Sequence, residues 1–371
     1  MASRFRRRGM TYYFHLRYGD NIHSMIGIDI SDRSIKIASV TSGSSREFRT
    51  VCWSPLEPDL IKRGIIQDVP TLVQALQKTC TKCSPFPVEG KDVVVSIPER
   101  QSFVRVLDLP LMSDAEIDEA VGWAIRKDLP FDLDRVYLDW QPIAGAASAN
   151  IRQVVVGAAQ KEVVDPLLAA LDGAGFIVKA LELEAQAMVR SLLPIDALSV
   201  EGVAICDLGA TTTKVIYFDK GSMRFTLALP TGGDQLTATL VEKFGLSPED
   251  ALEKKSIIGI LAREGSDGEV AYALREAVLD LLHQVQGGIQ SALSQLSATS
   301  GLRGILISGG GANLPGIRDA FSEVFPGIPV DVGNPLINLS SVGKRGTVAI
   351  TPQDASHFVT AIGLALRHNT L

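Results

Sequence analysis

Two short segments of the chain combine residue types that could bind phosphate. Asp29 ends an apolar run and precedes a turn of small or polar residues, and Lys36 stands seven positions later. Asp207 has similar surroundings, with Lys214 again seven positions on. The two aspartates and the two lysines are each separated by 178 residues, so the sequence predicts a duplicated fold.

The chemistry expected of these segments follows from their small turns. A tight turn without bulky side chains presents backbone N–H groups and hydroxyls to an anion. An aspartate at the end of the preceding strand could hold Mg²⁺ through water, since this ion keeps much of its hydration shell. One such turn is a weak indication, but two that face each other would bind a polyphosphate from both sides.

A third segment has a different role. The apolar run Ile305-Leu306-Ile307 leads into Ser308 and three glycines, Gly309 to Gly311, shortly before a predicted helix. Glycines let a flat base or ribose lie against the backbone, and a helix N-terminus favours nearby negative charge. A plain strand-to-helix turn is the alternative.

The elements that must position these residues are strands and helices in alternation. Apolar runs predict strands at 26–30, 35–40, 93–97, 203–207, 214–219, 223–229 and 304–307. Helices are predicted after Pro70, within 233–296 and after Pro352. Residues 101–175 are interpreted as an inserted α+β module, whose first helix opens with the capping box Ser113-Asp114-Ala115-Glu116.

Composition indicates a globular protein with more than one domain. A length of 371 residues predicts two or three domains, and 46% hydrophobic residues suffice for a core in each. The formal net charge of −6 argues against a nucleic-acid binder, and no apolar stretch is long enough for a transmembrane segment. We therefore expect a soluble, cytoplasmic protein.

Two further features have ordinary interpretations. The four cysteines, Cys52, Cys80, Cys83 and Cys206, are too few for a disulfide framework and are expected to be reduced thiols. Cys80 and Cys83 have zinc-ligand spacing but lack a second pair. Residues 1–24 carry a basic cluster and are expected to be a disordered extension, with a membrane-surface anchor as the alternative.

The order of these features resembles that of the actin-like ATPase superfamily. Within it, short segments spread over residues 25–371 are similar to the PilM family of type IV pilus assembly proteins, relatives of the division protein FtsA. These segments are Ser96-Ile97-Pro98, Asp108-Leu109-Pro110, Asp128-Leu129-Pro130-Phe131, Glu182-Leu183-Glu184-Ala185, Thr231-Gly232-Gly233 and Ala361-Ile362-Gly363-Leu364-Ala365.

The resemblance implies an α/β, two-lobed actin-like ATPase fold of duplicated ribonuclease-H-like domains, with an FtsA-type inserted subdomain 1C. The implied division is 25–100, 176–200 and 350–371 for subdomain 1A, 101–175 for 1C, 201–231 and 302–349 for 2A, and 232–301 for 2B.

The resemblance also implies ATP and Mg²⁺ as cofactors, with Asp29 and Asp207 at the metal. The implied cofactor-binding residues are Asp29, Ser31, Lys36, Asp207, Gly209, Thr211, Thr212, Lys214, Gly233, Gly309, Gly310 and Gly311. Ser31 stands where the family usually has glycine, so hydrolysis is expected to be slow at most. Glu184 is the candidate catalytic residue, which would orient water; a first-turn glutamate that complements the helix dipole is the alternative.

The implied function is that of a cytoplasmic scaffold of the type IV pilus assembly platform, associated peripherally with the inner membrane through its partners. It would bind the cytoplasmic N-terminus of a PilN-like membrane protein, other platform and motor components, and copies of itself in a ring. Two alternatives stay open: an FtsA-like filament-forming membrane anchor, and a small-molecule kinase of the same fold. Walker A, H-E-x-x-H and G-x-S-x-G patterns are absent from the sequence.

Overall fold

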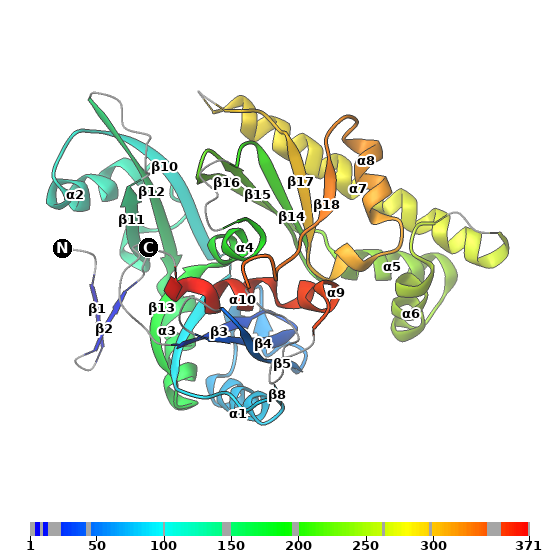
Figure 1. Cartoon of the computed structure of the whole chain (residues 1–371), viewed down its shortest axis with the longest axis horizontal. Helices are drawn as coiled ribbons and strands as arrows, with labels where there is room; N and C mark the ends of the chain where they lie inside the picture. The colour runs from blue at the N-terminus through cyan, green and yellow to red at the C-terminus, as the bar shows by residue number, and fades with distance from the viewer. Residues whose placement is uncertain are drawn as a thin grey trace. The chain divides into compact units, whose positions relative to one another are not determined.

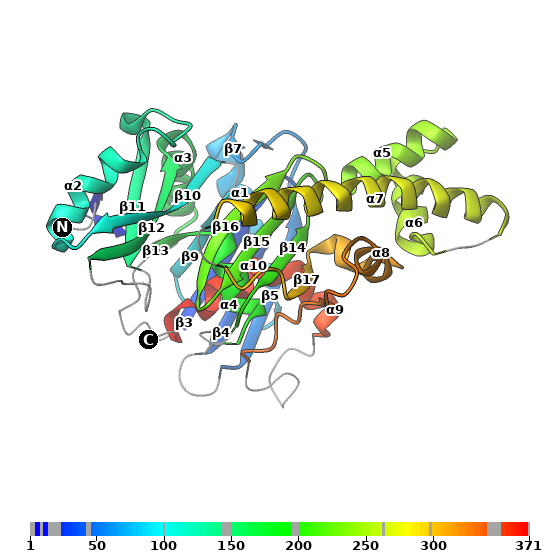
Figure 2. The same cartoon turned by 90° about the horizontal axis from the view of Figure 1, so that it is seen from above.

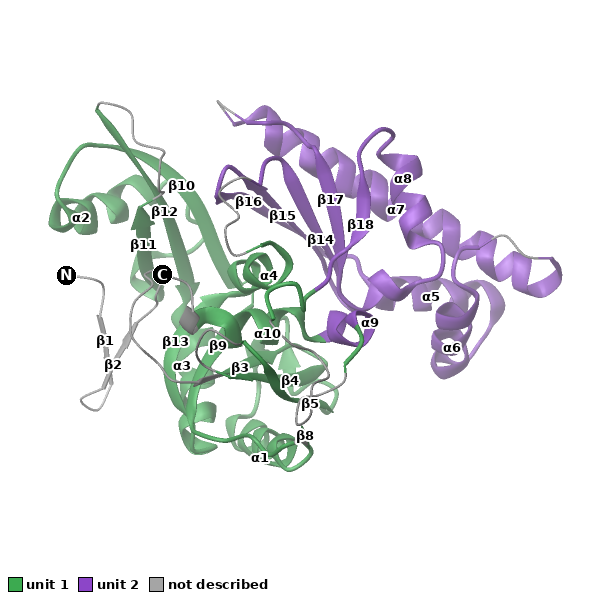
Figure 3. Ribbon diagram, in the orientation of Figure 1, with its two compact units in different colours: residues 1–195, 335–351, 358–371 green, residues 196–334, 352–357 purple. Residues whose placement is uncertain are grey.

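The computed structural model forms two compact units. One comprises residues 1–195, 335–351 and 358–371, and the other comprises 196–334 and 352–357 (Figure 1, Figure 3). The structure describes residues 4–7, 10–13, 24–41, 46–98, 101–142, 150–194, 200–261, 264–296, 299–339 and 350–369.

The first unit is built on a six-stranded mixed sheet in the order β13-β9-β3-β4-β5-β8. Its strands are β3 (Ser24–Ile30), β4 (Ser34–Thr41), β5 (Phe48–Pro55), β8 (Ser84–Pro85), β9 (Asp92–Ile97) and β13 (Ile177–Leu183). β3, β9 and β13 run parallel, while β4, β5 and β8 extend the sheet in antiparallel fashion.

Helices bury both faces of this sheet because its strand residues alternate between two apolar cores. Ile28 and Val95 belong to the larger core with α1 (Val69–Cys80) and α3 (Lys161–Gly173). On the opposite face, Val94 packs in a small core with residues of α4 (Glu184–Leu192) and α10 (Val359–Ala365).

The second unit has a five-stranded sheet in the order β16-β15-β14-β17-β18. Its strands are β14 (Val203–Leu208), β15 (Thr213–Asp219), β16 (Ser222–Leu229), β17 (Gly304–Ser308) and β18 (Val330–Val332). Its main helices are α5 (Gly233–Phe244), α6 (Pro248–Ile258), α7 (Gly265–Ser294) and α8 (Ile317–Val324), which share one core with the sheet. The long α7 runs beside this sheet in Figure 2.

The two sheets have equivalent topologies, which confirms the predicted duplication. In each, three parallel strands are continued by two strands in antiparallel pairing, and β3, β4, β5, β9 and β13 correspond to β14, β15, β16, β17 and β18; the first sheet has β8 in addition. The predicted hairpin strands 214–219 and 223–229 match β15 and β16 within one residue.

The inserted module has its own sheet and core. Its elements are β10 (Ser102–Pro110), α2 (Asp114–Ile125), the 3-10 helix η2 (Leu133–Arg135), β11 (Val136–Pro142) and β12 (Ile151–Gln160). The predicted capping box is present, because the Glu116 N–H donates to Ser113 Oγ and Glu116 accepts from the Ser113 N–H. α3 was assigned to the module from the sequence, but its apolar residues pack in the larger core of the first unit.

Several boundaries differ from the expected ones. The predicted final helix is divided into α9 (Pro352–Ala355), the 3-10 helix η5 (Ser356–Phe358), α10 and the 3-10 helix η6 (Leu366–Asn369). Residues 335–339, expected in the second lobe, cluster with the first unit, since the Asn338 amide donates to the carbonyls of Arg190 and Leu193. The division into four subdomains stays a prediction.

The N-terminal residues contain two short strands, β1 (Arg4–Arg7) and β2 (Met10–Tyr13), which pair antiparallel. The rest of the predicted extension, apart from Ser24 in β3, lies outside the described residues, so its disorder stays a prediction. No helix within the described ranges is long and apolar enough to cross a membrane.

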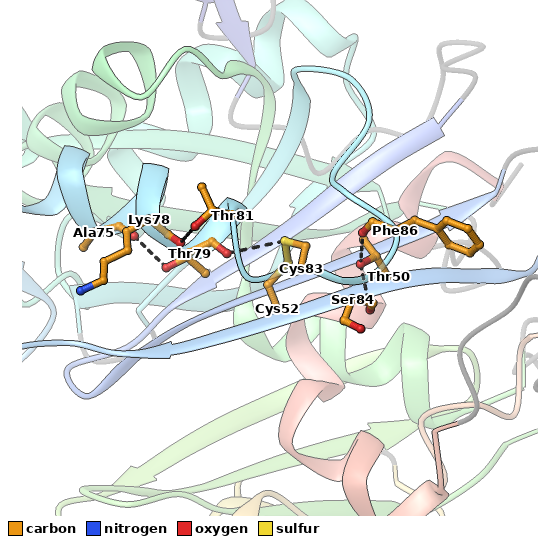
Figure 4. Close-up of a disulfide and its surroundings, with 9 residues drawn as sticks. All are labelled: Thr50, Cys52, Ala75, Lys78, Thr79, Thr81, Cys83, Ser84 and Phe86. Atoms are coloured by element: carbon orange, nitrogen blue, oxygen red, sulfur yellow. Dashed lines mark hydrogen bonds between the residues drawn. A yellow bond between two sulfur atoms is a disulfide. The ribbon is translucent and has the colours of Figure 1, made fainter.

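The prediction of reduced thiols is wrong for two cysteines, because a disulfide joins Cys52 to Cys83 (Figure 4). Cys52 lies on β5, and Cys83 lies between α1 and β8. The Thr50 hydroxyl donates to the carbonyls of Ser84 and Phe86, which holds this segment beside β5. The pairing of β5 with β8 brings together two residues 31 positions apart, which their spacing did not indicate. Cys80 and Cys206 are free thiols.

Candidate functional site

The first Asp–Lys hairpin is formed by β3 and β4. Asp29 pairs directly with Lys36, and Lys36 Nζ lies 3.8 Å from Asp29 Oδ2. Ser96 on β9 donates from its hydroxyl to Asp29 Oδ1 at 2.8 Å. Asp29 is only 6% exposed, so a lysine and a hydroxyl balance a buried carboxylate here.

The turn of this hairpin is closed by Ser31. Its N–H donates to the Ser34 carbonyl at 2.9 Å. Its hydroxyl accepts from the Ser34 N–H at 3.2 Å and lies within reach of the Ser34 carbonyl. Serine thus stabilises the turn through a local side-chain bond, which a glycine at this position could not make.

The second hairpin repeats this register on β14 and β15. Asp207 pairs with Lys214, and Lys214 Nζ again lies 3.8 Å from the aspartate Oδ2. The Gly209 N–H donates to the Thr212 carbonyl at 3.0 Å, and a Cβ on Gly209 would lie 2.7 Å from that oxygen. Only glycine therefore fits this turn without a backbone shift.

The first turn of α5 is hydrogen-bonded to the second hairpin. The Gly233 N–H donates to the Gly209 carbonyl at 2.9 Å, and the Asp234 N–H donates to the Ala210 carbonyl at 2.8 Å. Thr211 and Thr212 carry hydroxyls 3.3 Å apart in the same turn. Two backbone hydrogen bonds thus hold the start of α5 against the turn of the hairpin.

The predicted glycine loop lies against the end of β14. Gly309 has a φ of 79°, and a Cβ there would lie 2.5 Å from Asp207 Oδ1. Gly311 approaches Leu208 closely, and Gly310 lies beside His357. Gly310 to Asn313 form the 3-10 helix η4, so the expected helix begins later, at Ile317.

Sequence reasoning missed three polar residues near the second hairpin. Lys255 on α6 donates from Nζ to the Gly233 carbonyl at 2.8 Å and to Thr237 Oγ1 at 2.7 Å. Burial lowers the pKa of Lys255, although Asp234 opposes the shift. Thr213 and Ser308 carry buried hydroxyls without a hydrogen-bond partner among the described residues, and Ser308 pairs with Asp207 in register.

Each half of the predicted cofactor site is therefore assembled within its own unit. The first unit brings together Asp29, Ser31 and Lys36. The second brings together Asp207, Gly209, Thr211, Thr212, Lys214, Gly233, Gly309, Gly310 and Gly311. Of the missed residues, Ser308 could have been suspected because it opens the glycine run, whereas Lys255 carried no local signal.

Glu184 begins α4, immediately after β13. It lies at the edge where the parallel strands β3, β9 and β13 end, which is the edge of the first hairpin. Its side chain is buried, and its proposed catalytic role stays a prediction.

A buried charge cluster surrounds Glu182 of β13, in the same sheet as the first hairpin, with Arg190 from α4 and Arg367 from η6. Arg190 Nη1 donates to Glu182 Oε2 and to the Gly363 carbonyl, at 2.8 and 2.7 Å, and Arg367 Nη1 lies 3.2 Å from Glu182 Oε1. Burial alone would raise the pKa of Glu182, but the charges of Arg190 and Arg367 outweigh it and hold the pKa below its ordinary value.

The duplicated sheets define the class of protein: a two-lobed actin-like fold. Ethanolamine utilization protein EutJ from Carboxydothermus hydrogenoformans shares it with a TM-score of 0.56 and 16% identity, over 92% of this chain and 89% of that one. MreB5 of Spiroplasma citri bound to AMPPNP matches with a TM-score of 0.50 and 12% identity, over 92% and 94% of the two chains.

A more similar structure is a PilM–PilN type IV pilus biogenesis complex, with a TM-score of 0.77 and 23% identity over 94% of this chain and 99% of that one. The family model of type IV pilus assembly protein PilM matches residues 27–369, and the chain belongs to this family.

The cell division protein FtsA is also similar to this chain. FtsA of Enterococcus hirae is 22% identical over 338 residues, which cover 81% of this chain and 76% of that protein. FtsA of Pseudomonas aeruginosa is 23% identical over 354 residues, covering 84% and 83%.

Proposed function

We propose that this protein is an ATP-binding cytoplasmic scaffold of the type IV pilus inner-membrane assembly platform. Membership of the PilM family supports the assembly role. The similarity to a PilM–PilN complex over 94% of this chain supports a PilN-like membrane protein as the partner. The partner would anchor the scaffold at the inner membrane, where motor components and further copies of the scaffold in a ring are additional proposed partners.

The observation that carries nucleotide binding is the repeated Asp–Lys hairpin. Both hairpins place an aspartate opposite a lysine at the same 3.8 Å separation, at the end of a central strand. The second unit adds glycines beside the hairpin and the buried hydroxyls of Thr213 and Ser308, which have no hydrogen-bond partner among the described residues. The groups of each hairpin suit phosphate oxygens, which would accept from hydroxyls and attract the lysine of that hairpin.

Mg²⁺ is the proposed cation, with Asp29 and Asp207 as the candidate carboxylate of each hairpin. The described residues contain no group of three or more His, Cys, Asp or Glu placed to hold a metal ion. Mg²⁺ is commonly bound through one or two carboxylates together with water and phosphate oxygens. We therefore assign Mg²⁺ to Asp207 and Asp29 only as the partner of a bound nucleotide.

Turnover is proposed to be slow. Ser31 stands where the family usually has glycine, and its hydroxyl is hydrogen-bonded within the first turn, so phosphate is expected to approach this turn less closely. Glu184 is the proposed residue for orienting water. Phosphate release by the purified protein near the ~10 s⁻¹ of a typical enzyme would refute the scaffold assignment.

Titration calorimetry with Mg-ATP tests nucleotide binding. Asp207→Ala should weaken the affinity roughly 100-fold, because it removes the cation contact and leaves Lys214 without its carboxylate. Asp331→Ala, which removes an exposed aspartate from the same sheet, is the matched control and should bind normally. Equal affinities of the two folded variants would exclude this role for Asp207.

A binding assay with a synthetic peptide tests the partner. The peptide is the cytoplasmic N-terminus of the PilN-like protein encoded beside this one, and we place its contact near 103–110 and the inserted module, which provide strand edges for an extended segment. Binding should survive Asp207→Ala and fail when the module is replaced by a short linker, with circular dichroism confirming that each variant folds. Equal retention by both variants would place the contact elsewhere.

A further inference from the structure

A small hairpin ties the first Asp–Lys hairpin to another part of its unit. β6 (Ile61–Lys62) pairs with β7 (Ile65–Ile66), and the turn between them has φ values of 53° at Arg63 and 81° at Gly64. The Arg63 N–H donates to Asp32 Oδ2 at 3.2 Å, and the Gly64 N–H donates to Asp32 Oδ1 at 2.8 Å. Asp32 follows Ser31 in the turn of the first Asp–Lys hairpin. Both oxygens of its carboxylate therefore accept hydrogen bonds from the Arg63-Gly64 turn.

The same small hairpin reaches the inserted module on its other side. The Arg63 carbonyl accepts from Gln101 Nε2 at 2.8 Å, and Gln101 Oε1 accepts from Gln160 Nε2. Gln101 immediately precedes β10, and Gln160 is the last residue of β12. These two glutamines therefore mark the points where the chain enters and leaves the sheet of the module.

The turn has little freedom to move independently of its neighbours. A Cβ on Gly64 would lie 2.9 Å from Pro98 Cβ, and the Gln67 N–H donates to the Leu60 carbonyl at 2.9 Å, which continues the hairpin. Hydrogen bonds to an ionised carboxylate are among the stronger ones in proteins. A shift of Asp32 is therefore expected to move the Arg63-Gly64 turn with it.

We propose that the chain of contacts from Asp32 through Arg63 and Gly64 to Gln101 and Gln160, here called the relay, couples phosphate binding at the first hairpin to the inserted module. The proposal rests on the proposed function, in that the ligand of the hairpin is a nucleotide phosphate. A phosphate that binds beside this turn repositions Asp32, which is part of the turn. The displacement reaches the base of the module through two hydrogen-bonded steps, and coupling of this kind is reciprocal.

Hydrogen exchange of the full-length protein, followed by mass spectrometry with and without Mg-AMPPNP, tests the relay. Nucleotide should slow exchange at the start of β10 and the end of β12 by at least about fivefold. Asp32→Ala and Gln101→Ala should abolish this protection and speed exchange there even without nucleotide. Asp108→Ala and Gln153→Ala are matched controls, since Gln153 Nε2 donates to Asp108 Oδ1 at 2.6 Å between the same two strands, away from the relay. They should retain the protection.

The possible failures are distinguishable. If calorimetry finds no nucleotide binding to the unmodified protein, the proposed function fails. The relay is then tested by comparing hydrogen-exchange rates at the base of the module in Asp32→Ala and Asp108→Ala, both without nucleotide. Nucleotide binding without protection at the base of the module would overturn the relay alone. Equal exchange in Asp32→Ala and Asp108→Ala would overturn it as well. Gln160→Ala removes only the last contact and provides the test if Asp32→Ala fails to fold.

Discussion

The two Asp–Lys hairpins share one register but have different surroundings. In the first, the side chain of Asp29 is 8% exposed and accepts from Ser96, while Ser31 closes its own turn. In the second, the side chain of Asp207 is 15% exposed and glycines replace side chains around it. Ser308, which pairs with Asp207 between β14 and β17, has a hydroxyl without a hydrogen bond within the described part of the chain.

This difference teaches that strand register and turn chemistry can serve separate purposes. The register places an aspartate opposite a lysine in both units. The first turn then uses the Ser31 hydroxyl for a contact within the turn, whereas the buried hydroxyls of Thr213 and Ser308 beside the second turn have no hydrogen-bond partner among the described residues. We therefore expect the second hairpin to dominate affinity for nucleotide and the first to connect binding with the rest of its unit.

The largest expected effect is on the buried charges around Glu182 in the first unit. Arg190→Met should lower the free energy of unfolding by about 3 to 5 kcal/mol, because it leaves Glu182 buried with less compensation. Arg318→Met is the matched control, since Arg318 pairs with Asp331 at an exposed site in the second unit, and it should cost less than ~1 kcal/mol. Urea unfolding measures both, and equal losses would contradict the assigned importance of the buried cluster.

The disulfide should have the next largest effect, again on the first unit. Cys83→Ser should lower the free energy of unfolding by about 2 to 4 kcal/mol, since the bond restricts the unfolded chain. Cys80→Ser changes a nearby free thiol and should cost much less. Thermal unfolding with and without a dithiol reductant gives the comparison. Four reactive thiols in the denatured, unreduced protein would show that Cys52 and Cys83 are not joined.

Changes in the turns of the two Asp–Lys hairpins should affect Mg-ATP affinity to different extents. Gly209→Ala should weaken Mg-ATP binding about tenfold, because the new Cβ would displace the Thr212 carbonyl. Ser31→Ala should change the affinity less than about threefold, since its hydroxyl stabilises only its own turn. Calorimetry on both variants decides. A larger loss for Ser31→Ala would reverse the proposed division of roles.

A smaller effect is expected from pH. The pKa of Glu182 is held below its ordinary value by Arg190 and Arg367, in spite of burial. The stability that it contributes is therefore fully present above the unfolded pKa of about 4.3 and is lost as pH falls through the lower folded pKa. Glu182→Gln should lack this component of acid unfolding, whereas Glu323→Gln, at an exposed pair with Arg275, should retain it. Identical acid profiles for the two variants would contradict this assignment.

The smallest effect should come from the N-terminal residues. Residues 1–24 contain the short hairpin β1–β2, and the rest of the segment is predicted to be disordered, so their removal should leave the melting temperature and nucleotide affinity unchanged. Differential scanning calorimetry on the truncated protein is the measurement. A fall of several degrees would mean that this segment packs on the first unit.

Sequence alone determined the features that depend on neighbouring residues. The alternation of apolar residues predicted the central strands, and the capping box Ser113 to Glu116 predicted the start of α2. The paired spacing of Asp and Lys predicted both hairpins and the duplication, because an antiparallel turn fixes the register of its own strands. Local patterns also indicated the inserted module, and the family resemblance added the two-lobed fold and the FtsA-type assignment of that module.

Tertiary structure decided what depends on contacts between distant residues. Cys52 meets Cys83 only because β8 pairs with β5, Lys255 reaches Gly233 from another helix, and Asp32 meets the turn at Gly64. The last helix is divided after α9, although its apolar pattern is continuous, and residues 352–357 cluster with the second unit while α10 packs on the first. Local pattern carries no information on such pairs, because a side chain's partner is selected by the packing of whole elements rather than by its own neighbours in the chain.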